Sequence, residues 1–303
     1  MIALLLLGLA AATPDAAHRL RQCIVKGDRQ CLVQELKSPP KDGSAEYLSA
    51  VAEACLLLGR NAEATAAIGS AVAKKPGDYD LLLQQGRTYQ RTGDQVRAIE
   101  SFLHAAKVHP RAPEVFYSVG LSFFLAHEYE RAAKHFVHAV QLDPSNDKAE
   151  FMLAVIDILQ SNREADAKAH MERALALQPQ NPHYLLHYGV LLAQMGEREQ
   201  AATVLEKAVR ADPSNPLAHF NLGRLSRQMN NLPKARSELE EAVRLRPRLA
   251  RAHYQLASVY RALGEREKAG EAMKLFQKYQ DEDRDDEPVD GPPAYAFKDQ
   301  PAR

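Results

Sequence analysis

The sequence lacks tryptophan altogether and has only three cysteines among its 303 residues. Its charges balance, since 39 basic and 39 acidic residues leave a formal net charge of zero. A chain without excess positive charge has no general electrostatic attraction to nucleic acid, so we expect none as a partner. The cysteines form no Cys-x-x-Cys pair, so their spacing does not support a structural zinc site.

Catalytic motifs are missing as well. The chain contains no HExxH, GxSxG, P-loop or GxGxxG pattern. His183 and His187 are spaced to share one face of a helix, but two histidines make an incomplete metal site, because three or four ligands are usual. We therefore expect a non-enzymatic protein without a metal or other cofactor.

What the sequence does contain is a repeat of 34 residues, well formed in residues 182–215. Six prolines end successive units at intervals of 34, 34, 35, 34 and 34 residues, and proline blocks the continuation of a helix. These prolines are Pro76, Pro110, Pro144, Pro179, Pro213 and Pro247. The seven units begin at Ala45, Tyr79, Pro113, Lys148, Pro182, Pro216 and Ala250, and Asp147 is the single inserted residue.

Each unit has the same internal pattern, counted from its first residue as position 1. Position 8 is mostly glycine or alanine, position 20 is alanine in all seven units and position 27 is alanine in six. Position 15 is glycine, asparagine or histidine, types that tolerate the positive φ common at a helix end. Each unit is thus predicted to be a helix, a tight turn and a second helix.

With small residues at positions 8, 20 and 27 and proline at position 32, the unit resembles the tetratricopeptide repeat over residues 45–280. The resemblance implies an all-α fold, namely a right-handed α-solenoid of stacked helix-turn-helix repeats, and a role in binding proteins. Position 4 departs from the family, which usually has tryptophan there. Here it is Leu48, Leu82, Phe116, Phe151, Leu185, His219 and His253, and we expect both histidines to be core residues.

Residues 1–12 precede the repeats and are apolar with small residues at their end. Such a run is typical of a secretory signal peptide, with cleavage expected near Ala12. It predicts a periplasmic or secreted protein of the exported bacterial type, without stable membrane insertion after cleavage. Because no basic residue precedes the run, an apolar N-terminal helix or membrane anchor is the alternative.

Residues 13–38 align with a shortened repeat and are predicted to form a helical hairpin. Cys23 and Cys31 lie four residues on either side of Gly27, so they would flank one turn. Export would favour a disulfide between them, and two buried thiols are the alternative. Residues 281–303 carry eight acidic residues against three basic ones, plus four prolines, and are predicted to be a disordered acidic tail.

The functional prediction depends on a face of the first helix that is not needed for packing. Positions 2, 5, 9 and 12 share this face. In the proteins that this chain resembles, it lines a concave groove that holds extended peptides. In the third to fifth units the face is apolar, with Tyr117, Leu121, Phe124, Met152, Ile156, Leu159, Leu186 and Val190. In the sixth and seventh units it is basic and polar, with Phe220, Arg224, Arg227, Arg251, Tyr254, Ser258 and Arg261, and the four arginines form its basic part.

These patterns predict a scaffold or adaptor that binds a peptide segment or protein surface. Apolar side chains of the ligand would occupy the centre of the groove, and a carboxylate would meet the arginines. The acidic tail of the chain itself would compete for the same groove. Alternatively, the apolar residues simply pack on the neighbouring helix. Alternative functions are a self-assembling envelope scaffold and the substrate-specificity arm of a carbohydrate-processing or transfer system.

Overall fold

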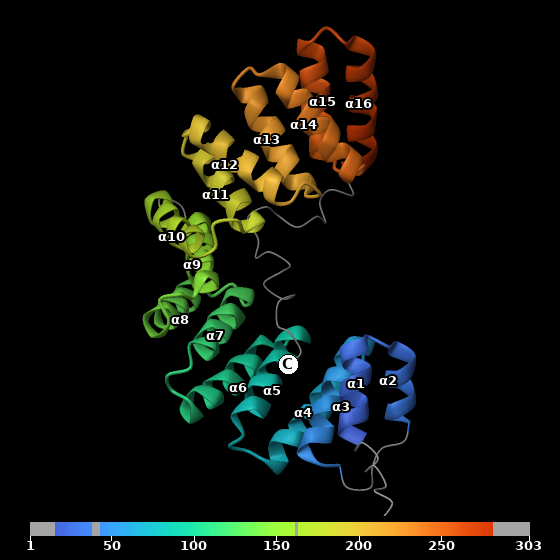
Figure 1. Cartoon of the computed structure of the whole chain (residues 1–303), viewed down its shortest axis with the longest axis vertical. Helices are drawn as coiled ribbons and strands as arrows, with labels where there is room; N and C mark the ends of the chain where they lie inside the picture. Colours follow the sequence, from blue (N-terminus) through green and yellow to red (C-terminus); the bar gives the residue numbers. More distant parts are fainter. Residues whose placement is uncertain (1–15, 38–42, 161–162, 281–303) are drawn as a thin grey trace, which may run out of the picture. The chain divides into compact units, whose positions relative to one another are not determined.

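The computed structural model describes residues 16–37, 43–160 and 163–280. Within these ranges every regular element is an α-helix, and sixteen helices follow one another along the chain (Figure 1). This confirms the predicted all-α class. The predicted signal segment, residues 1–12, and the predicted acidic tail, residues 281–303, lie outside the described residues.

The first eight helices are α1 (Ala16–Lys26), α2 (Arg29–Leu36), α3 (Ala45–Leu58), α4 (Asn61–Lys74), α5 (Tyr79–Arg91), α6 (Gln95–Val108), α7 (Pro113–Leu125) and α8 (Tyr129–Leu142). The others are α9 (Asp147–Leu159), α10 (Glu164–Leu177), α11 (Pro182–Gln194), α12 (Arg198–Ala211), α13 (Pro216–Gln228), α14 (Leu232–Leu245), α15 (Ala250–Ala262) and α16 (Arg266–Tyr279).

Helices α3 to α16 form hairpins in which each first helix packs most closely on the helix that follows it. The stacked helix-turn-helix arrangement is therefore confirmed. The chain divides into two compact units, of which the first contains α1–α8 and the second contains α9–α16. The boundary lies after Leu142, close to the inserted Asp147, and each unit is described by itself.

The turns inside the hairpins adopt the backbone conformation that the sequence predicts. Position 15 has a positive φ in six of the seven repeats, and in the fourth repeat it is Asn162, outside the described residues. Two of the six are not glycine, since both His127 and Asn230 have φ of 59°. The turn therefore requires this conformation even where the side chain makes it less favourable.

Several of the first helices begin with a capping polar side chain. Asn215 precedes Pro216, the first residue of α13, and its Oδ1 atom accepts hydrogen bonds from the backbone N–H groups of Leu217 and Ala218 at 2.9 and 3.2 Å. Asn181 caps α11 in the same way, again followed by proline. Such a cap satisfies donors that have no partner within the helix, so it helps to fix where α11 and α13 begin. Helices α7 and α15 begin without a side-chain cap.

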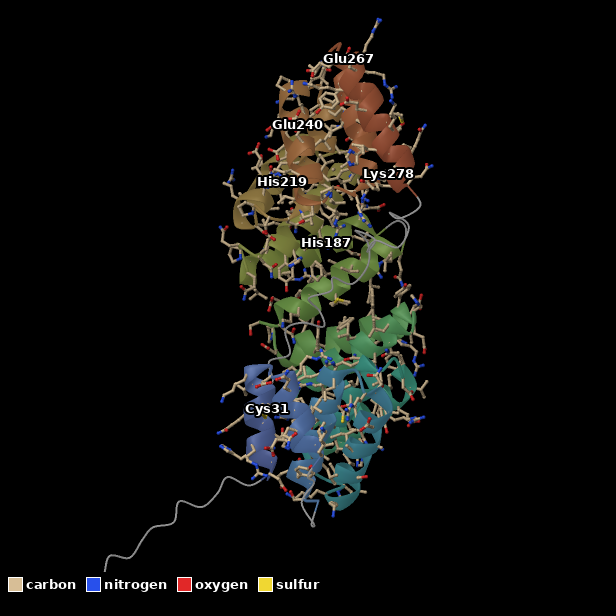
Figure 2. The ribbon with its side chains drawn as sticks, turned by 90° about the vertical axis from the view of Figure 1, so that its right-hand side faces the viewer. Cys31, His187, His219, Glu240, Glu267 and Lys278 are labelled. Carbon is tan, nitrogen blue, oxygen red and sulfur yellow. A yellow bond between two sulfur atoms is a disulfide. The ribbon has the colours of Figure 1, made fainter. Side chains whose placement is uncertain are left out.

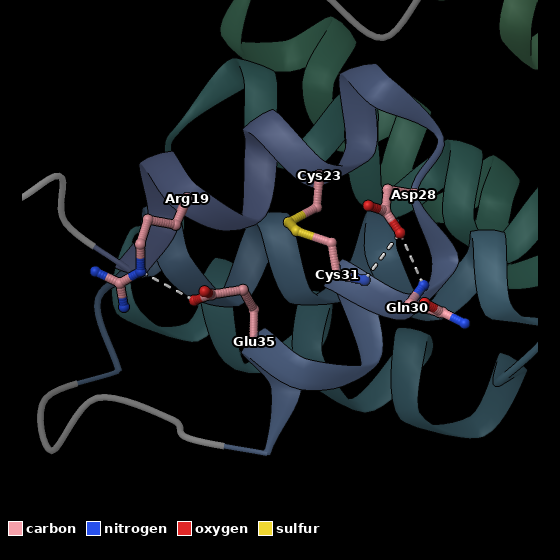
Figure 3. Close-up of a disulfide and its surroundings, with 6 residues drawn as sticks. All are labelled: Arg19, Cys23, Asp28, Gln30, Cys31 and Glu35. Atoms are coloured by element: carbon pink, nitrogen blue, oxygen red, sulfur yellow. Dashed lines mark hydrogen bonds and ion pairs between the residues drawn. A yellow bond between two sulfur atoms is a disulfide. The ribbon is translucent and has the colours of Figure 1, made fainter.

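The N-terminal hairpin of α1 and α2 is closed by a disulfide between Cys23 and Cys31, whose Cα atoms are 5.6 Å apart (Figure 3). Gly27 turns the chain with φ of 64°, and Asp28 Oδ1 accepts hydrogen bonds from the N–H groups of Gln30 and Cys31, both at 3.0 Å. An ion pair of 3.0 Å joins Arg19 of α1 to Glu35 of α2. Covalent and polar contacts thus tie both ends of this short hairpin.

Candidate functional site

The predicted groove residues belong to five first helices. Tyr117, Leu121 and Phe124 lie on α7 in the first unit. The other five apolar residues lie in the second unit, on α9 and α11. The basic residues also lie in the second unit, two on α13 and two on α15.

Most of the predicted apolar residues are buried. The exposed fraction is 7% or less for six of the eight, namely Leu121, Phe124, Met152, Ile156, Leu186 and Val190. Leu159 is 37% exposed, and Tyr117 is half-buried with its ring centre 5.5 Å from that of Phe136. This burial favours the alternative that these side chains pack within the chain, and it leaves Leu159 and Tyr117 with the larger accessible surfaces.

The basic residues of α13 and α15 gather around one aromatic ring. The guanidinium carbon of Arg224 lies 6.0 Å from the ring centre of Phe220, and that of Arg251 lies 5.4 Å from the same centre. These distances are in the range in which a guanidinium is attracted to an aromatic face. Arg224 is one turn after Phe220 on α13, whereas Arg251 comes from α15. Arginines of two successive repeats therefore converge.

Hydrogen bonds hold the side chains of this group in place. Arg224 Nη2 donates to Asn221 Oδ1 at 3.2 Å, and Asn221 Nδ2 donates to the carbonyl of Leu217 at 2.8 Å. Arg227 Nε donates to Gln255 Oε1 of α15 at 2.8 Å. We call Phe220, Arg224, Arg227 and Arg251 the arginine cluster.

Arg261 is not part of the arginine cluster. It is exposed and lies ten residues after Arg251 on α15, roughly 15 Å along the helix. Tyr254, by contrast, is three residues after Arg251, so the two share a face of α15. The side chain of Tyr254 is 46% exposed, and its ring centre lies 5.4 Å from that of Phe276. Phe220 and Tyr254 both occupy position 5, so both belong to the predicted face of the first helix.

Comparison with known families identifies the repeat. A family model described as the "Cilia and flagella-associated protein 70 C-terminal domain" matches residues 16–255, more than three quarters of the chain. A second model, described as "Tetratricopeptide repeat", matches residues 250–283. The chain belongs to this family of tetratricopeptide-repeat domains.

Solved tetratricopeptide-repeat structures share the fold. YrrB, described as a TPR protein with an unusual peptide-binding site, is 19% identical with a TM-score of 0.51, over 61% of this chain and 95% of YrrB. PilF of Pseudomonas aeruginosa is 21% identical with a TM-score of 0.58, over 67% of this chain and 92% of PilF. A tetratricopeptide-repeat protein of Parabacteroides merdae is 16% identical with a TM-score of 0.59, over 85% of this chain and 97% of its own. No curated protein matches the sequence significantly.

Of the paired histidines of this tetratricopeptide-repeat protein, His187 packs against Phe151, with the ring centres 5.3 Å apart. Burial and, to a smaller extent, the neighbouring His183 together lower the pKa of His187 to about 4. Across the part of the chain that the structure describes, no group of three or more histidine, cysteine, aspartate or glutamate side chains could hold a metal ion. In the same residues, no helix has the length and hydrophobicity needed to cross a bilayer.

Proposed function

We propose that the chain is a non-enzymatic protein-interaction scaffold whose arginine cluster binds a carboxylate-bearing segment of a partner protein. The observation that carries the proposal is the convergence of Arg224 and Arg251, from successive repeats, on the ring of Phe220. The family assignment supports the general role, because tetratricopeptide repeats stack into extended surfaces that bind other proteins. The family assignment does not specify which residues bind the partner or which chemical group they bind.

Arginine suits this ligand for geometric reasons. Its planar guanidinium presents N–H groups in pairs that match the two oxygens of a carboxylate. Contact with the face of Phe220 restricts the motion of the guanidinium, whose N–H groups point outward in its own plane. Because the group is already ordered, less conformational entropy is lost when a ligand binds. An aspartate, a glutamate or a C-terminal carboxylate of an extended segment would therefore be bound at the cluster.

Apolar contacts would add to the binding of the same segment. Tyr254 offers an exposed ring on the face of α15 that carries Arg251. Leu159, on α9 in the same unit, also has accessible surface. In the first unit, taken by itself, Tyr117 is the only one of the three predicted groove residues that is not buried in the described structure.

The acidic tail is proposed to compete with this ligand. Residues 281–303 follow α16 directly in sequence and carry eight acidic residues. The cluster lies on α13 and α15 of the same repeat array. A competing contact between acidic and arginine side chains weakens as salt rises, because ions screen exposed charges over about 10 Å at 0.1 M ionic strength.

We also propose that the protein works outside the cytoplasm. The disulfide between Cys23 and Cys31 supports this, because disulfides persist mainly in oxidising compartments. The apolar, small-ended run of residues 1–12 supports it independently. Mass spectrometry of the protein recovered from its host tests the proposal, and an intact Met1 together with three free thiols would contradict it.

Defined peptides test the binding function. We would measure the fluorescence anisotropy of labelled peptides that carry an aromatic residue and two aspartates, and of matched peptides with asparagine in place of aspartate. The expected result is binding of the acidic peptides only. Replacement of both Arg224 and Arg251 with Gln should weaken binding at least about ten-fold, or about 1.4 kcal/mol.

The Arg198→Gln, Arg210→Gln double variant is the matched control, because it removes the same number of positive charges from α12, where both arginines are exposed. It should leave the affinity unchanged within about two-fold. Equal losses in the control and the double variant, with both proteins folded, would show that general charge and not the cluster attracts the peptide.

A further inference from the structure

The two histidines at position 4 make the same contact across a repeat boundary. His219 Nε2 lies 3.1 Å from the carbonyl oxygen of Pro213, and His253 Nε2 lies 2.8 Å from that of Pro247. In both cases the proline closes one repeat and the histidine, six residues later, belongs to the first helix of the next. Both side chains are buried, with exposed fractions of 7% and 5%. Each histidine therefore ties its helix to the end of the preceding repeat.

His219 differs from His253 in having an acceptor at its other ring nitrogen too. Its Nδ1 atom lies 2.7 Å from Glu238 Oε2 of α14. A neutral imidazole carries a single N–H, so it can donate to the carbonyl or to the carboxylate but not to both. The protonated ring donates to both. The geometry around His219 therefore favours the imidazolium form.

The surrounding charges act in the same direction. The hydrogen bond that His219 donates to Glu238 raises the pKa of His219 most strongly, against the lowering by burial, and the Pro213 carbonyl and the charges of Glu238 and Glu241 also raise it. His219 lines a hollow of about 470 Å³, and its other lining residues all come from α14: Ser237, Glu238, Glu240, Glu241 and Arg244. Figure 2 labels His219 and Glu240 on the second unit.

The other charges at this hollow are paired. Arg244 forms an ion pair with Glu241, and Glu240 accepts hydrogen bonds from Tyr260 of α15 at 2.9 Å and from Arg236 at 2.8 Å. The Pro213 carbonyl, which contacts the other ring nitrogen, belongs to the loop between α12 and α13. Glu238 is thus the carboxylate bonded directly to His219.

We propose that protonated His219 holds α13 on α14 and on the preceding repeat, and we call this contact the His219 clasp. Once His219 loses its proton, the second unit becomes less stable and the arginine cluster binds its ligand less tightly. The clasp acts on the cluster because Phe220 is the residue next to His219 on α13. The effect on binding rests on the proposed function, whereas the effect on stability does not.

The direction of the pH effect follows from linkage. A histidine whose pKa is higher in the folded than in the unfolded protein binds its proton more tightly when folded. Its contribution to stability is complete below the unfolded value of about 6.5 and is lost as pH rises through the folded pKa. The stability of the second unit should therefore fall between neutral and mildly alkaline pH.

NMR titration of the histidine rings in the full chain tests the protonation. His219 should titrate above about 6.5, and its midpoint should fall in the Glu238→Gln variant. Urea unfolding at pH 6 and pH 9 tests the stability, with a lower midpoint expected at pH 9. His219→Leu should remove that difference without loss of the fold, because leucine already occupies position 4 in three other repeats.

His253→Leu is the matched control, since it removes a position-4 histidine that has the same proline contact. It should keep the pH difference. A His219 midpoint at or below about 6.5, or an unfolding difference that persists in His219→Leu, would overturn the clasp. If stability follows His219 while the affinity for the acidic peptide is the same at both pH values, the link to the cluster is overturned. Absence of peptide binding at any pH contradicts the proposed function alone.

Discussion

The backbone of Gly189 in α11 runs against the side chain of Leu205 in α12, so that a Cβ atom on Gly189 would lie 2.6 Å from Leu205 Cγ. The next repeat has the same relationship, with 2.7 Å between a Cβ atom on Gly223 and Cγ of Leu239. Both leucines are buried. Position 8 is therefore small because position 24 of the facing helix fills the space.

Gly189→Ala should destabilise the second unit by up to about 2 kcal/mol. Overpacking costs about 1–3 kcal/mol, and the better helix propensity of alanine returns up to about 1 kcal/mol. Gly270→Ala is the control, since Gly270 lies on α16 and a Cβ atom there has no neighbour within 4 Å. It should be neutral or stabilising. Urea unfolding of both variants compares them, and equal effects would contradict the close-packing explanation.

The N-terminal hairpin should depend on its disulfide. The link spans eight residues of sequence, and the loss of unfolded-chain entropy on closing such a loop corresponds to about 2–3 kcal/mol. In the Cys23→Ser, Cys31→Ser double variant, the amides of α1 and α2 should therefore exchange with solvent faster. Hydrogen exchange with mass spectrometry measures this, with α15 and α16 as internal controls. Unchanged protection of α1 and α2 would mean that their apolar contacts suffice.

Deletion of residues 281–303 should increase the affinity for the acidic peptide at low salt. The difference should shrink as salt rises, because the competing contact is electrostatic. Anisotropy titrations of the full and shortened chains at about 20 mM and 500 mM salt measure both effects. A control in which the eight acidic residues of the tail are replaced with asparagine and glutamine separates charge from length. Equal affinities at low salt would rule out competition by the tail.

Two carboxylates of α9 are buried, and removing the charge of one should change the stability in the opposite direction from removing the charge of the other. Burial raises the pKa of Asp157, although Arg163 and His170 lower it, so the charged form is disfavoured in the folded state. By linkage, Asp157 reduces stability as pH rises above the unfolded value of about 3.9. Asp157→Asn should therefore raise the urea midpoint at pH 7 and change it little at pH 3.

Glu150→Gln is the comparison. Glu150 is 5% exposed, and its Oε2 atom lies 2.6 Å from His170 Nδ1 and accepts a hydrogen bond from Arg173 Nε at 3.0 Å. Loss of its charge weakens hydrogen bonds to charged groups, which contribute about 1.5–3 kcal/mol each. This variant should lower the midpoint at pH 7. Shifts of the same sign in both variants would contradict the distinction between them.

Much of the fold was predictable because its signals are local. The proline spacing marks each repeat, and the residue types at position 15 predict the positive φ seen at His127 and Asn230. The site was less predictable. The face that carries Phe220 and Arg251 follows from helical periodicity, but their convergence depends on how one first helix is placed beside the next.

The burial of the predicted groove residues could not be predicted from the repeat pattern either. Periodicity places Leu121 and Ile156 on a face that the repeat does not need for its own packing, yet they are 1% and 0% exposed. The exposed fraction of a side chain depends on all of its neighbours in space, which a 34-residue pattern does not specify. Likewise, the pattern predicts His219 as a core residue but not its bond to Pro213, which depends on the side-chain rotamer and on the backbone of the turn.

The contact between Gly189 and Leu205 has a consequence for recombination. Both residues belong to the same 34-residue unit, so a gene rearrangement that moves the unit as a whole carries the contact with it. The contact between Pro213 and His219 joins two units and would be lost unless the new neighbours supply both partners. Duplication and exchange of repeats therefore preserve the contacts inside each hairpin. The contacts between two newly joined repeats have to evolve separately.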